Sequence, residues 1–513
     1  SIKMKAHRIR PLIFIPYGIL ILFLGALSCR DYSHLQNPLL FIILLAFLTP
    51  LHWPILKIGI KPKSNEGFHP SPLALALFLI LLSLNLTPLS QEKGRYTLSL
   101  LLGMNGAFFL VVGLSESCWT GIYKRCVIKV SEYILGLPRS VFLGATFLIF
   151  FLMTSLGCWA VFGGIPHVED SIAQLFQAMI FASGRVTALL PSGGEFFEFP
   201  NIIMSERWYS QYPPGHSLLL VPWVLLGAPW ILNPLLGALS VFLFYFIGLE
   251  IRGESSGRLA ALLAFASPFF FFMSASFMNH TSTLFFLSLF TLFYLRSARM
   301  GGISNAVIAG FSLGMAVLIR PLTAFGWSLP FAGYSIYLMT KDKRQIFPQI
   351  IIVLSLLPFM AVLLGYNQLT NGNPFLFGYT VLHGKAHSLG FGLRGLTYFP
   401  LTNYTPWQGI NNFAHNLNAL EKYLFEWPYP SLLFGFLVIL SSERPRYVWL
   451  LFGGFYSLGV AYIFHFFHQH CLGPRFLFEA LPAMVVLSSM GLLVGPRVFS
   501  PLSREHDGGS KIT

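Results

Sequence analysis

The feature that most limits what this chain can fold into is a series of long apolar runs. Pro11–Leu27, Val141–Val161 and Leu284–Leu295 are such runs, and several approach the roughly 20 residues with which an α-helix crosses about 30 Å of hydrocarbon. Only 10% of the residues are charged, against about 25% in soluble globular domains. These charges are too few to cover a soluble surface, so the sequence predicts a polytopic membrane protein.

The apolar runs are continuous rather than alternating, which favours helices over a lipid-facing barrel. We therefore expect an all-α fold, a polytopic membrane helix bundle of about 14 transmembrane helices. The expected spans lie near residues 11–28, 38–56, 72–90, 97–115, 141–163, 232–250, 258–277, 281–297, 303–320, 323–340, 346–366, 429–441, 447–466 and 475–494.

The net charge of +14 would suggest a nucleic-acid partner in a soluble protein, but here the basic residues gather between spans. With the N-terminus inside, 23 of the 33 Lys and Arg residues fall on one side of the membrane, as the positive-inside rule predicts for cytoplasmic segments. Both termini are then cytoplasmic, and we expect no nucleic-acid partner. The five cysteines form no CxxC pair, so neither a disulfide framework nor a zinc module is expected.

Two long segments, 164–214 and 367–427, fall on the outer side in this topology, and loops of this length are usually functional. Within the first, Ser171–Gly184 has apolar residues at helical spacing and should form an amphipathic helix along the membrane surface. Gly215–Val224 and the basic segment Ile122–Leu135 are further candidates for surface helices.

The first candidate site is the acidic pair Glu169 and Asp170, placed directly after a span emerges. An acid at this depth suits a general base acting on a hydroxyl. Asp170 could instead cap the helix that follows it, and spacing alone favours the cap.

The second candidate is the segment Arg207–His216, in which aromatic residues surround paired prolines. Tyr212 and its neighbours fit an interfacial aromatic belt, the commoner explanation, or a surface on which a sugar stacks. His216 could be a ligand, although a lone histidine is more often a hydrogen-bonded structural residue.

Asn279 and His280 lie at the junction of two apolar spans, where lipid exposure would be costly, so they should face protein or a water-filled cavity. Arg320 ends a span and either snorkels to the interface or holds a phosphate through its fork of N–H donors.

The last candidate is the segment that begins at His465 and runs to Glu479. His465 and His468 would share a helix face as a metal pair might, but no third ligand stands at diagnostic spacing, so an interfacial or hydrogen-bonded role is favoured. Arg475 and Glu479 are four residues apart and could form an intrahelical pair.

The order of several motifs resembles that of the glycosyltransferase C superfamily, in the branch of protein O-mannosyltransferases and aminoarabinose transferases. This branch includes bacterial dolichyl-phosphate-mannose-like transferases. The resemblance covers about residues 141–495 and rests on the outer acidic pair followed by LFQAMIFASG, WYSQYPPGHSLLL, GRLAALLAFASPFFFFMSASFMNHTS, LIRPLTA, GNPFLFGYT and GPRFLFEALP.

The resemblance implies transfer of a sugar from a polyprenyl-phosphate donor to a lipid, glycan or protein acceptor on the outer face, with inversion at the anomeric carbon. Asp170 matches the catalytic aspartate of the family, while the glutamate that follows it is Ser171 here, so Glu169 could substitute. In the lipid A branch the motif before the paired prolines is Glu-Lys, which falls on Gln211-Tyr212 here. The two departures, here and at Ser171, weaken any metal site and any lysine-phosphate contact carried over from that branch. A divalent cation is therefore left open as a cofactor.

Charge stabilisation of the leaving phosphate would fall first to Arg320 and Arg475, with Arg207 and Arg394 behind them. We expect Asp170 to face a water-filled cavity whose opposite wall carries Arg320 or Arg475, because ionisable groups at outer helix ends are costly unless they share a site. The expected substrate-binding residues are Arg320, Arg475, Arg207, Tyr212, His216, His280 and Asn279.

Three parts of the chain are expected: a four-helix membrane extension at 1–140, a glycosyltransferase C-like module at 141–495 and a cytoplasmic tail at 496–513. The expected location is a bacterial inner membrane with the active site on the periplasmic or extracellular side. The rival hypothesis is a non-catalytic assembly subunit of a membrane complex, whose partner could bind 1–140. A transporter is a weaker alternative.

Overall fold

The computed structural model describes Tyr133 and residues 136–499, apart from 398–399, 427–430, 441–444 and 446. The four spans expected before residue 116 and most of Ile122–Leu135 therefore lie outside the described residues. The chain divides into two compact units, and one of them comprises Pro138–Glu426 and Pro445–Ser489. The other unit includes α18 (Leu433–Leu440) and the end of α20 (Leu481–Phe499).

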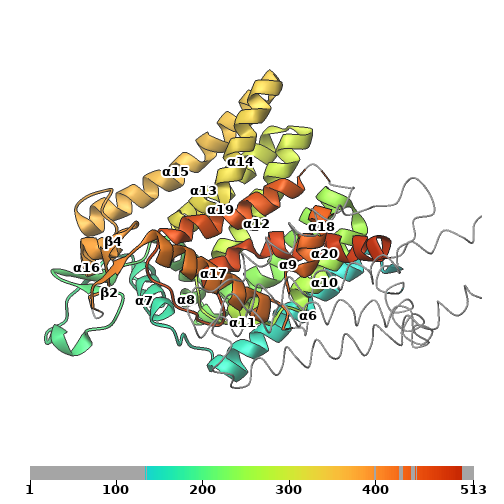
Figure 1. Cartoon of the computed structure of the whole chain (residues 1–513). Coiled ribbons are helices and arrows are strands. Elements are labelled where there is room, and N and C mark those ends of the chain that lie inside the picture. Colours follow the sequence, from blue (N-terminus) through green and yellow to red (C-terminus); the bar gives the residue numbers. More distant parts are fainter. Residues whose placement is uncertain are drawn as a thin grey trace, which may run out of the picture. The chain divides into compact units, whose positions relative to one another are not determined.

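The larger unit consists mainly of helices, which confirms the all-α class (Figure 1). The remaining α-helices are α6 (Arg139–Phe162), α7 (Glu169–Ala182), α8 (Gly215–Leu225), α9 (Leu232–Arg252), α10 (Glu254–Phe265), α11 (Pro268–Ala275), α12 (His280–Met300), α13 (Ile303–Ile319), α14 (Pro321–Lys341), α15 (Ile346–Asn371), α16 (Gly378–His383), α17 (Pro406–Tyr423) and α19 (Val448–Ile463). Short 3-10 helices are η1 (Gly194–Phe197), η2 (Pro229–Ile231), η3 (Lys343–Gln345), η4 (Lys385–His387) and η5 (Arg475–Ala480).

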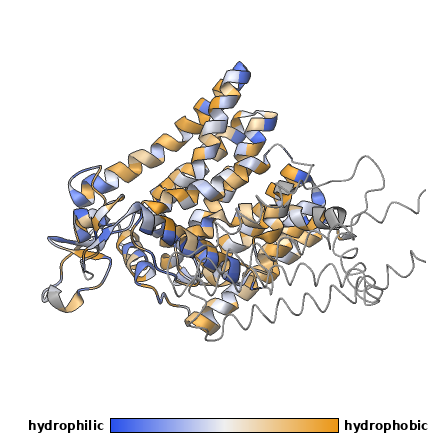
Figure 2. Ribbon diagram, viewed as in Figure 1, coloured by the Kyte–Doolittle hydropathy of each residue, from blue (hydrophilic) through white to orange (hydrophobic). Residues whose placement is uncertain are grey.

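Within the described part of the chain, five helices are long and apolar enough to cross a membrane, or six if one bent pair is a single span. Of the most apolar window of His280–Met300, 78% is buried, against 17% for Lys343–Asn371. The ribbon of α15 is accordingly coloured hydrophobic along most of its length (Figure 2), and Val353, Leu354 and Leu357 are exposed. Such a surface suits lipid, so the chain is an integral membrane protein. The total of about 14 spans stays a prediction.

The expected span 258–277 is wrong in one respect, because it is two helices. α10 and α11 meet at an angle of 64°. Pro268 begins α11, and the Ser267 hydroxyl accepts a hydrogen bond from the backbone N–H of Phe270 at 3.2 Å. Proline disfavours helical backbone at the preceding residue and lacks an N–H group, so a helix ends before Pro268 and a capped one begins there.

The first long loop contains the expected surface helix, α7, and also a small sheet that the sequence patterns did not predict. Its strands are β1 (Ala188–Leu189), β2 (Ile202–Met204) and β3 (Arg207–Ser210), in the order β1-β3-β2, and both pairings are antiparallel. A second antiparallel pair in the later loop joins β4 (Gly392–Arg394) to β5 (Thr402–Tyr404). These strands have two to four residues each, too few to produce a readable alternation.

The two long loops contact each other. The Tyr209 hydroxyl donates to Asn371 Oδ1 at 2.9 Å, and Arg207 Nη1 donates to the carbonyl of Leu369 at 2.6 Å. The loops therefore lie at the same end of the helices, as expected. Which side of the membrane this end faces stays a prediction.

Close packing between α13 and α15 depends on two glycines. Gly310 and Gly314 form a GxxxG motif, which lets helix backbones approach closely in membranes. A Cβ atom at Gly310 would lie 2.2 Å from the carbonyl oxygen of Ile352, and one at Gly314 would lie 2.4 Å from the Phe359 ring. Neither position has room for a side chain.

We expect Gly310→Leu to destabilise the protein, because the larger side chain would push α13 away from α15. Overpacking of this kind typically costs about 1–3 kcal/mol. The measurement is the midpoint of thermal unfolding in detergent. Gly333→Leu, on α14, is the matched control, because no atom lies within 4 Å of its Cβ position. Equal midpoints for the two variants would contradict the packing argument.

Candidate active site

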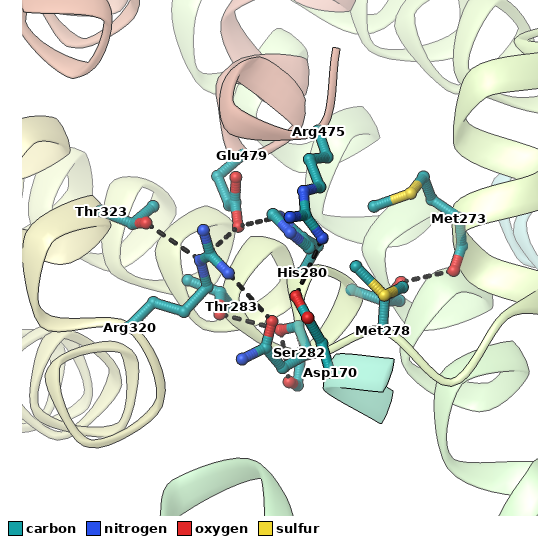
Figure 3. Close-up of polar contacts among 12 residues, drawn as sticks. Asp170, Met273, Met278, His280, Ser282, Thr283, Arg320, Thr323, Arg475 and Glu479 are labelled. Carbon is teal, nitrogen blue, oxygen red and sulfur yellow. Dashed lines mark hydrogen bonds and ion pairs between the residues drawn. The ribbon is translucent and has the colours of Figure 1, made fainter. Parts of the chain in front are cut away.

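Asp170 lies in the first turn of α7 and forms an ion pair across the chain. Its Oδ2 accepts a hydrogen bond from Arg475 Nη1 at 2.8 Å (Figure 3). Its Oδ1 accepts one from Asn201 Nδ2 at 3.2 Å. The helix is capped at Val168 with no side-chain hydrogen bond, so the interpretation of Asp170 as the N-cap is wrong. The pair confirms that Asp170 shares a site with Arg475, whereas the water-filled cavity stays a prediction.

Arg475 opens η5, a 3-10 turn that follows Pro474. The spacing of Arg475 and Glu479 predicted an intrahelical pair. This prediction is wrong, because the two side chains bind different partners. Arg475 turns to Asp170, while the Glu479 carboxylate accepts from His280 Nδ1 at 2.9 Å and lies 3.3 Å from Arg320 Nε. A 3-10 turn places side chains differently from the 3.6-residue period of an α-helix, which is why the spacing misled.

Arg320 joins several elements around Glu479. Its guanidinium donates to Asn279 Oδ1 at 3.1 Å, to Thr323 Oγ1 at 3.1 Å and to the Tyr462 hydroxyl at 2.8 Å. Its side chain is 15% exposed, so the snorkelling interpretation is wrong. Arg320 lies between α13 and α14, directly before Pro321, with φ −142° and ψ 84°. This is outside the helical region, which proline disfavours for the residue before it.

Asn279 and His280 face protein, as expected for polar groups at the junction of two apolar helices. Both side chains are buried, and the His280 and Glu479 side chains have no exposed surface. A carboxylate without solvent is costly unless charged or hydrogen-bonding groups surround it. Arg320 and His280 supply those groups to Glu479.

Two tyrosines from different loops lie beside the acid. Tyr212 and Tyr379 meet edge to face with ring centroids 5.5 Å apart. Burial raises the pKa of Tyr212 well above its ordinary value, and the neighbouring charge of Asp170 adds to the increase. Burial also raises the pKa of Tyr379, which lies near Arg320 and Asp170. Both phenols therefore remain protonated donors at neutral pH.

Gln211 reaches Asp170 through Asn201. Its Nε2 donates to Asn201 Oδ1 at 2.6 Å, and Asn201 Nδ2 donates to Asp170. Asn201 has a φ of 68°, a left-handed conformation that asparagine tolerates better than most residues. The amide pair thus fixes one oxygen of Asp170.

Four further residues that were expected at the site either make other contacts or lie exposed. His216 is buried, with its Nδ1 2.9 Å from Ser282 Oγ, as the structural interpretation expected. Arg207 binds the Leu369 carbonyl, and Arg394 donates to carbonyls of its own loop. Glu169 is exposed in the first turn of α7.

The prediction that His465 and His468 share a helix face is wrong, because α19 ends at Ile463. His465 Nδ1 contacts the Phe467 carbonyl at 2.9 Å. Burial lowers the pKa of His465 to about 4, so the ring is neutral at neutral pH. His468 lies instead beside His415 and His470.

The sequence patterns missed three residues of this site, Asn201, Tyr379 and Tyr462, and the partners of a fourth, Glu479. Asn201 and Tyr462 carried no signal, since contacts between distant segments leave no local pattern. Tyr379 belongs to the motif GNPFLFGYT and Glu479 to GPRFLFEALP, but neither motif indicates a contact with Asp170 or Arg320.

Comparison with known proteins supports the family resemblance. Residues 228–365 match the family model described as dolichyl-phosphate-mannose-protein mannosyltransferase. The matched region contains Asn279, His280 and Arg320. It begins after Asp170 and ends before Arg475. No curated protein sequence matches the chain.

Among solved structures, the chain is similar to ArnT from Cupriavidus metallidurans bound to undecaprenyl phosphate, with a TM-score of 0.46 and 13% identity. The alignment covers 69% of this chain and 60% of that one. For ArnT from the same organism in the apo state, the TM-score is 0.43, the identity 15% and the coverage 68% and 60%. The chain thus spans 60% of the length of these structures.

We expect Glu479→Leu to destabilise the protein strongly, because it leaves the buried Arg320 charge without its carboxylate. Removing one partner of a buried ion pair costs about 3–5 kcal/mol. The measurement is the thermal midpoint in detergent. As control, Arg139→Gln breaks the pair of Arg139 with Glu254, whose side chains are 55% and 37% exposed, and should change the midpoint much less. A Glu479→Leu midpoint at or above that of Arg139→Gln would show that the buried network does not hold the fold together.

Proposed function

We propose that this chain is a membrane glycosyltransferase that moves a sugar from a polyprenyl-phosphate donor to an acceptor hydroxyl on the non-cytoplasmic face. The observation that carries the proposal is the ion pair of Asp170 with Arg475 at 2.8 Å. It joins the first outer loop to a helix end 305 residues further along the chain. The match of residues 228–365 to a mannosyltransferase family supports the chemistry.

Asp170 is proposed as the general base. Its side chain is 21% exposed, so an acceptor hydroxyl can reach it. A carboxylate has about four lone-pair sites, and the hydrogen bonds from Arg475 and Asn201 occupy two of them. The remaining sites can take the acceptor proton. A carboxylate is too weak to remove the proton beforehand, so transfer occurs late, as the acceptor oxygen bonds to the anomeric carbon.

The phosphate is proposed to leave with the electrons of the breaking bond between the anomeric carbon and oxygen. It is acidic enough to need charge stabilisation rather than protonation. Arg475 Nε is buried and has no hydrogen-bond partner among the described residues. An unsatisfied buried donor is costly, and a phosphate oxygen would satisfy it. Arg320 is the second proposed phosphate contact, and attack from the face opposite the phosphate inverts the anomeric carbon.

The other proposed substrate contacts come from residues near Asp170 and Arg320. Tyr212, Asn279 and His280 would line the donor side, while Glu169, exposed beside Asp170, would assist with the acceptor. The acceptor is a hydroxyl of a lipid, glycan or protein. We place the protein in a bacterial inner membrane with both termini in the cytoplasm.

A second candidate is a non-catalytic assembly subunit, and one contact favours it. Ser171 replaces the family's glutamate, is buried and donates to the sulfur of Met278 at 3.1 Å. It is therefore packed as a structural residue. A partner could bind residues 1–140, most of which lie outside the described part of the chain.

We expect Asp170→Asn to abolish sugar transfer while the protein still folds. Asparagine keeps the shape and one acceptor oxygen, but losing base catalysis should lower the rate by roughly 10²–10⁴. Transfer is measured from a panel of polyprenyl-phosphate sugars, with monodispersity in detergent as the folding check. Glu206→Gln, an exposed acid of the same loop, should keep the wild-type rate. Normal transfer by Asp170→Asn would reject the base, and no transfer by wild type from any donor would favour the subunit.

We also expect cysteines at positions 198 and 385 to react with a membrane-impermeant label from outside intact cells. Both belong to the loops that meet at the active-site end, and the basic segments lie between spans at the other end. Each cysteine is introduced into a variant that lacks the native cysteines. A cysteine at position 343, between α14 and α15, should not react with the label. Labelling at 343, or at only one outer position, would reject the proposed orientation.

A further inference from the structure

Three histidines gather outside the site at Asp170. His415 comes from α17, and His468 and His470 come from the segment that follows α19. One ring nitrogen of each lies within 4.8 Å of the others, and all three residues are half-buried. The ring centroids of His415 and His470 are 4.6 Å apart, those of His468 and His470 5.2 Å, and those of His415 and His468 5.4 Å.

The fold brings them together for local reasons. α17 begins with a capping box in which the Thr405 side chain accepts from the backbone of Gln408 and the Gln408 side chain accepts from the backbone of Thr405. The helix packs on α19, so its middle turn faces the chain that leaves α19. His468 and His470 are two residues apart in a segment with no helix or strand, where alternate side chains can reach the same side.

We propose that His415, His468 and His470 bind a zinc-class divalent cation. Three adjacent imidazoles repel one another when protonated, whereas neutral imidazole is a preferred ligand of zinc and its neighbours. Ligand atoms around tetrahedral zinc lie about 3.4 Å apart at a Zn–N distance of about 2.0–2.1 Å. The three nitrogens lie within 4.8 Å of one another, so side-chain rotations would have to bring them closer, and a water molecule would take the fourth position.

Asn416 provides an independent sign of a ligand. Its side chain is buried, its Nδ2 lies 3.1 Å from His468 Nδ1, and its Oδ1 has no partner among the described residues. Turning the amide places Oδ1 against His468 Nδ1, from whose N–H it accepts a hydrogen bond, and the metal would then bind the other ring nitrogen, Nε2. Metal-bound histidines usually carry such a hydrogen-bonded partner on their other nitrogen.

A cation here would fasten α17 to the segment that leads into Arg475, five residues after His470. Its binding does not depend on the proposed transfer reaction, and its residues are separate from Asp170, Arg320 and Glu479. The proposed role is structural: the metal fixes the segment from which Arg475 reaches Asp170.

The test is metal binding by the purified full-length protein. After removal of bound metal, the protein is titrated with Co²⁺ in detergent, and Zn²⁺ is then added to displace it. We expect about one equivalent of Co²⁺ with the visible absorption of a four-coordinate nitrogen site, displaced by Zn²⁺ and unaffected by Mg²⁺. His470→Gln and His415→Gln should each weaken binding at least tenfold, and Asn416→Leu about 10–100-fold.

His167→Gln is the matched control, because His167 is exposed and contacts the Phe162 carbonyl. It should bind Co²⁺ as the wild type does. A double variant, His415→Gln with His470→Gln, that binds with wild-type affinity would overturn the proposal, as would a wild type that binds no Co²⁺. To separate loss of the site from loss of the fold, the thermal midpoint is compared with and without Zn²⁺. Zn²⁺ should raise the midpoint of the wild type and leave that of the double variant unchanged, and equal increases would also overturn the proposal.

Discussion

The need to neutralise charge away from water organises the centre of this protein. Glu479 has no exposed side-chain surface, and it is stable there because His280 Nδ1 and Arg320 Nε lie 2.9 and 3.3 Å from its Oε1. Each partner is fixed in turn, since Arg320 also binds Asn279 and the Tyr462 hydroxyl. The ends of α12, α13 and α19 are thereby held around η5. Because desolvated charges tolerate little displacement, this network sets the geometry from which Arg475 extends to Asp170.

The polar residues lie where helices begin or end, and proline marks several of these places. Pro268 and Pro321 begin α11 and α14, and Pro474 precedes η5. A helix end leaves backbone groups that need partners, and in an apolar environment polar side chains must supply them. The same places let side chains from distant segments converge, because the chain changes direction there. Structural necessity and the proposed chemistry therefore use the same positions.

The sequence predicted the helical class and most helices of the described region, because long apolar runs are a strong local signal. It also predicted that Asp170 would share a site with Arg320 or Arg475, since lone charges at helix ends are costly. It did not predict which groups pair. Glu479 and His280 are 199 residues apart, and nothing local records their contact. Spacing misled at Arg475, which opens a 3-10 turn, at His465, which follows a helix end, and at Asp170, which lies one residue inside a helix. In each case the error was a helix boundary displaced by a few residues, which periodicity does not resolve.

Under the proposed function, the pairing of Asp170 with Arg475 implies an order of binding. Without a ligand, the acid and the arginine satisfy each other at 2.8 Å, and the guanidinium is buried while the acid is partly exposed. The donor is a phosphodiester that carries one negative charge, as a carboxylate does, and its two unesterified oxygens can engage Arg475 through two parallel hydrogen bonds. It would therefore compete with Asp170 for the arginine. Once Arg475 turns to the phosphate, Asp170 has an additional free lone pair for the acceptor proton. The base would then become fully available only after the donor binds, which would limit loss of the sugar to water before the acceptor arrives.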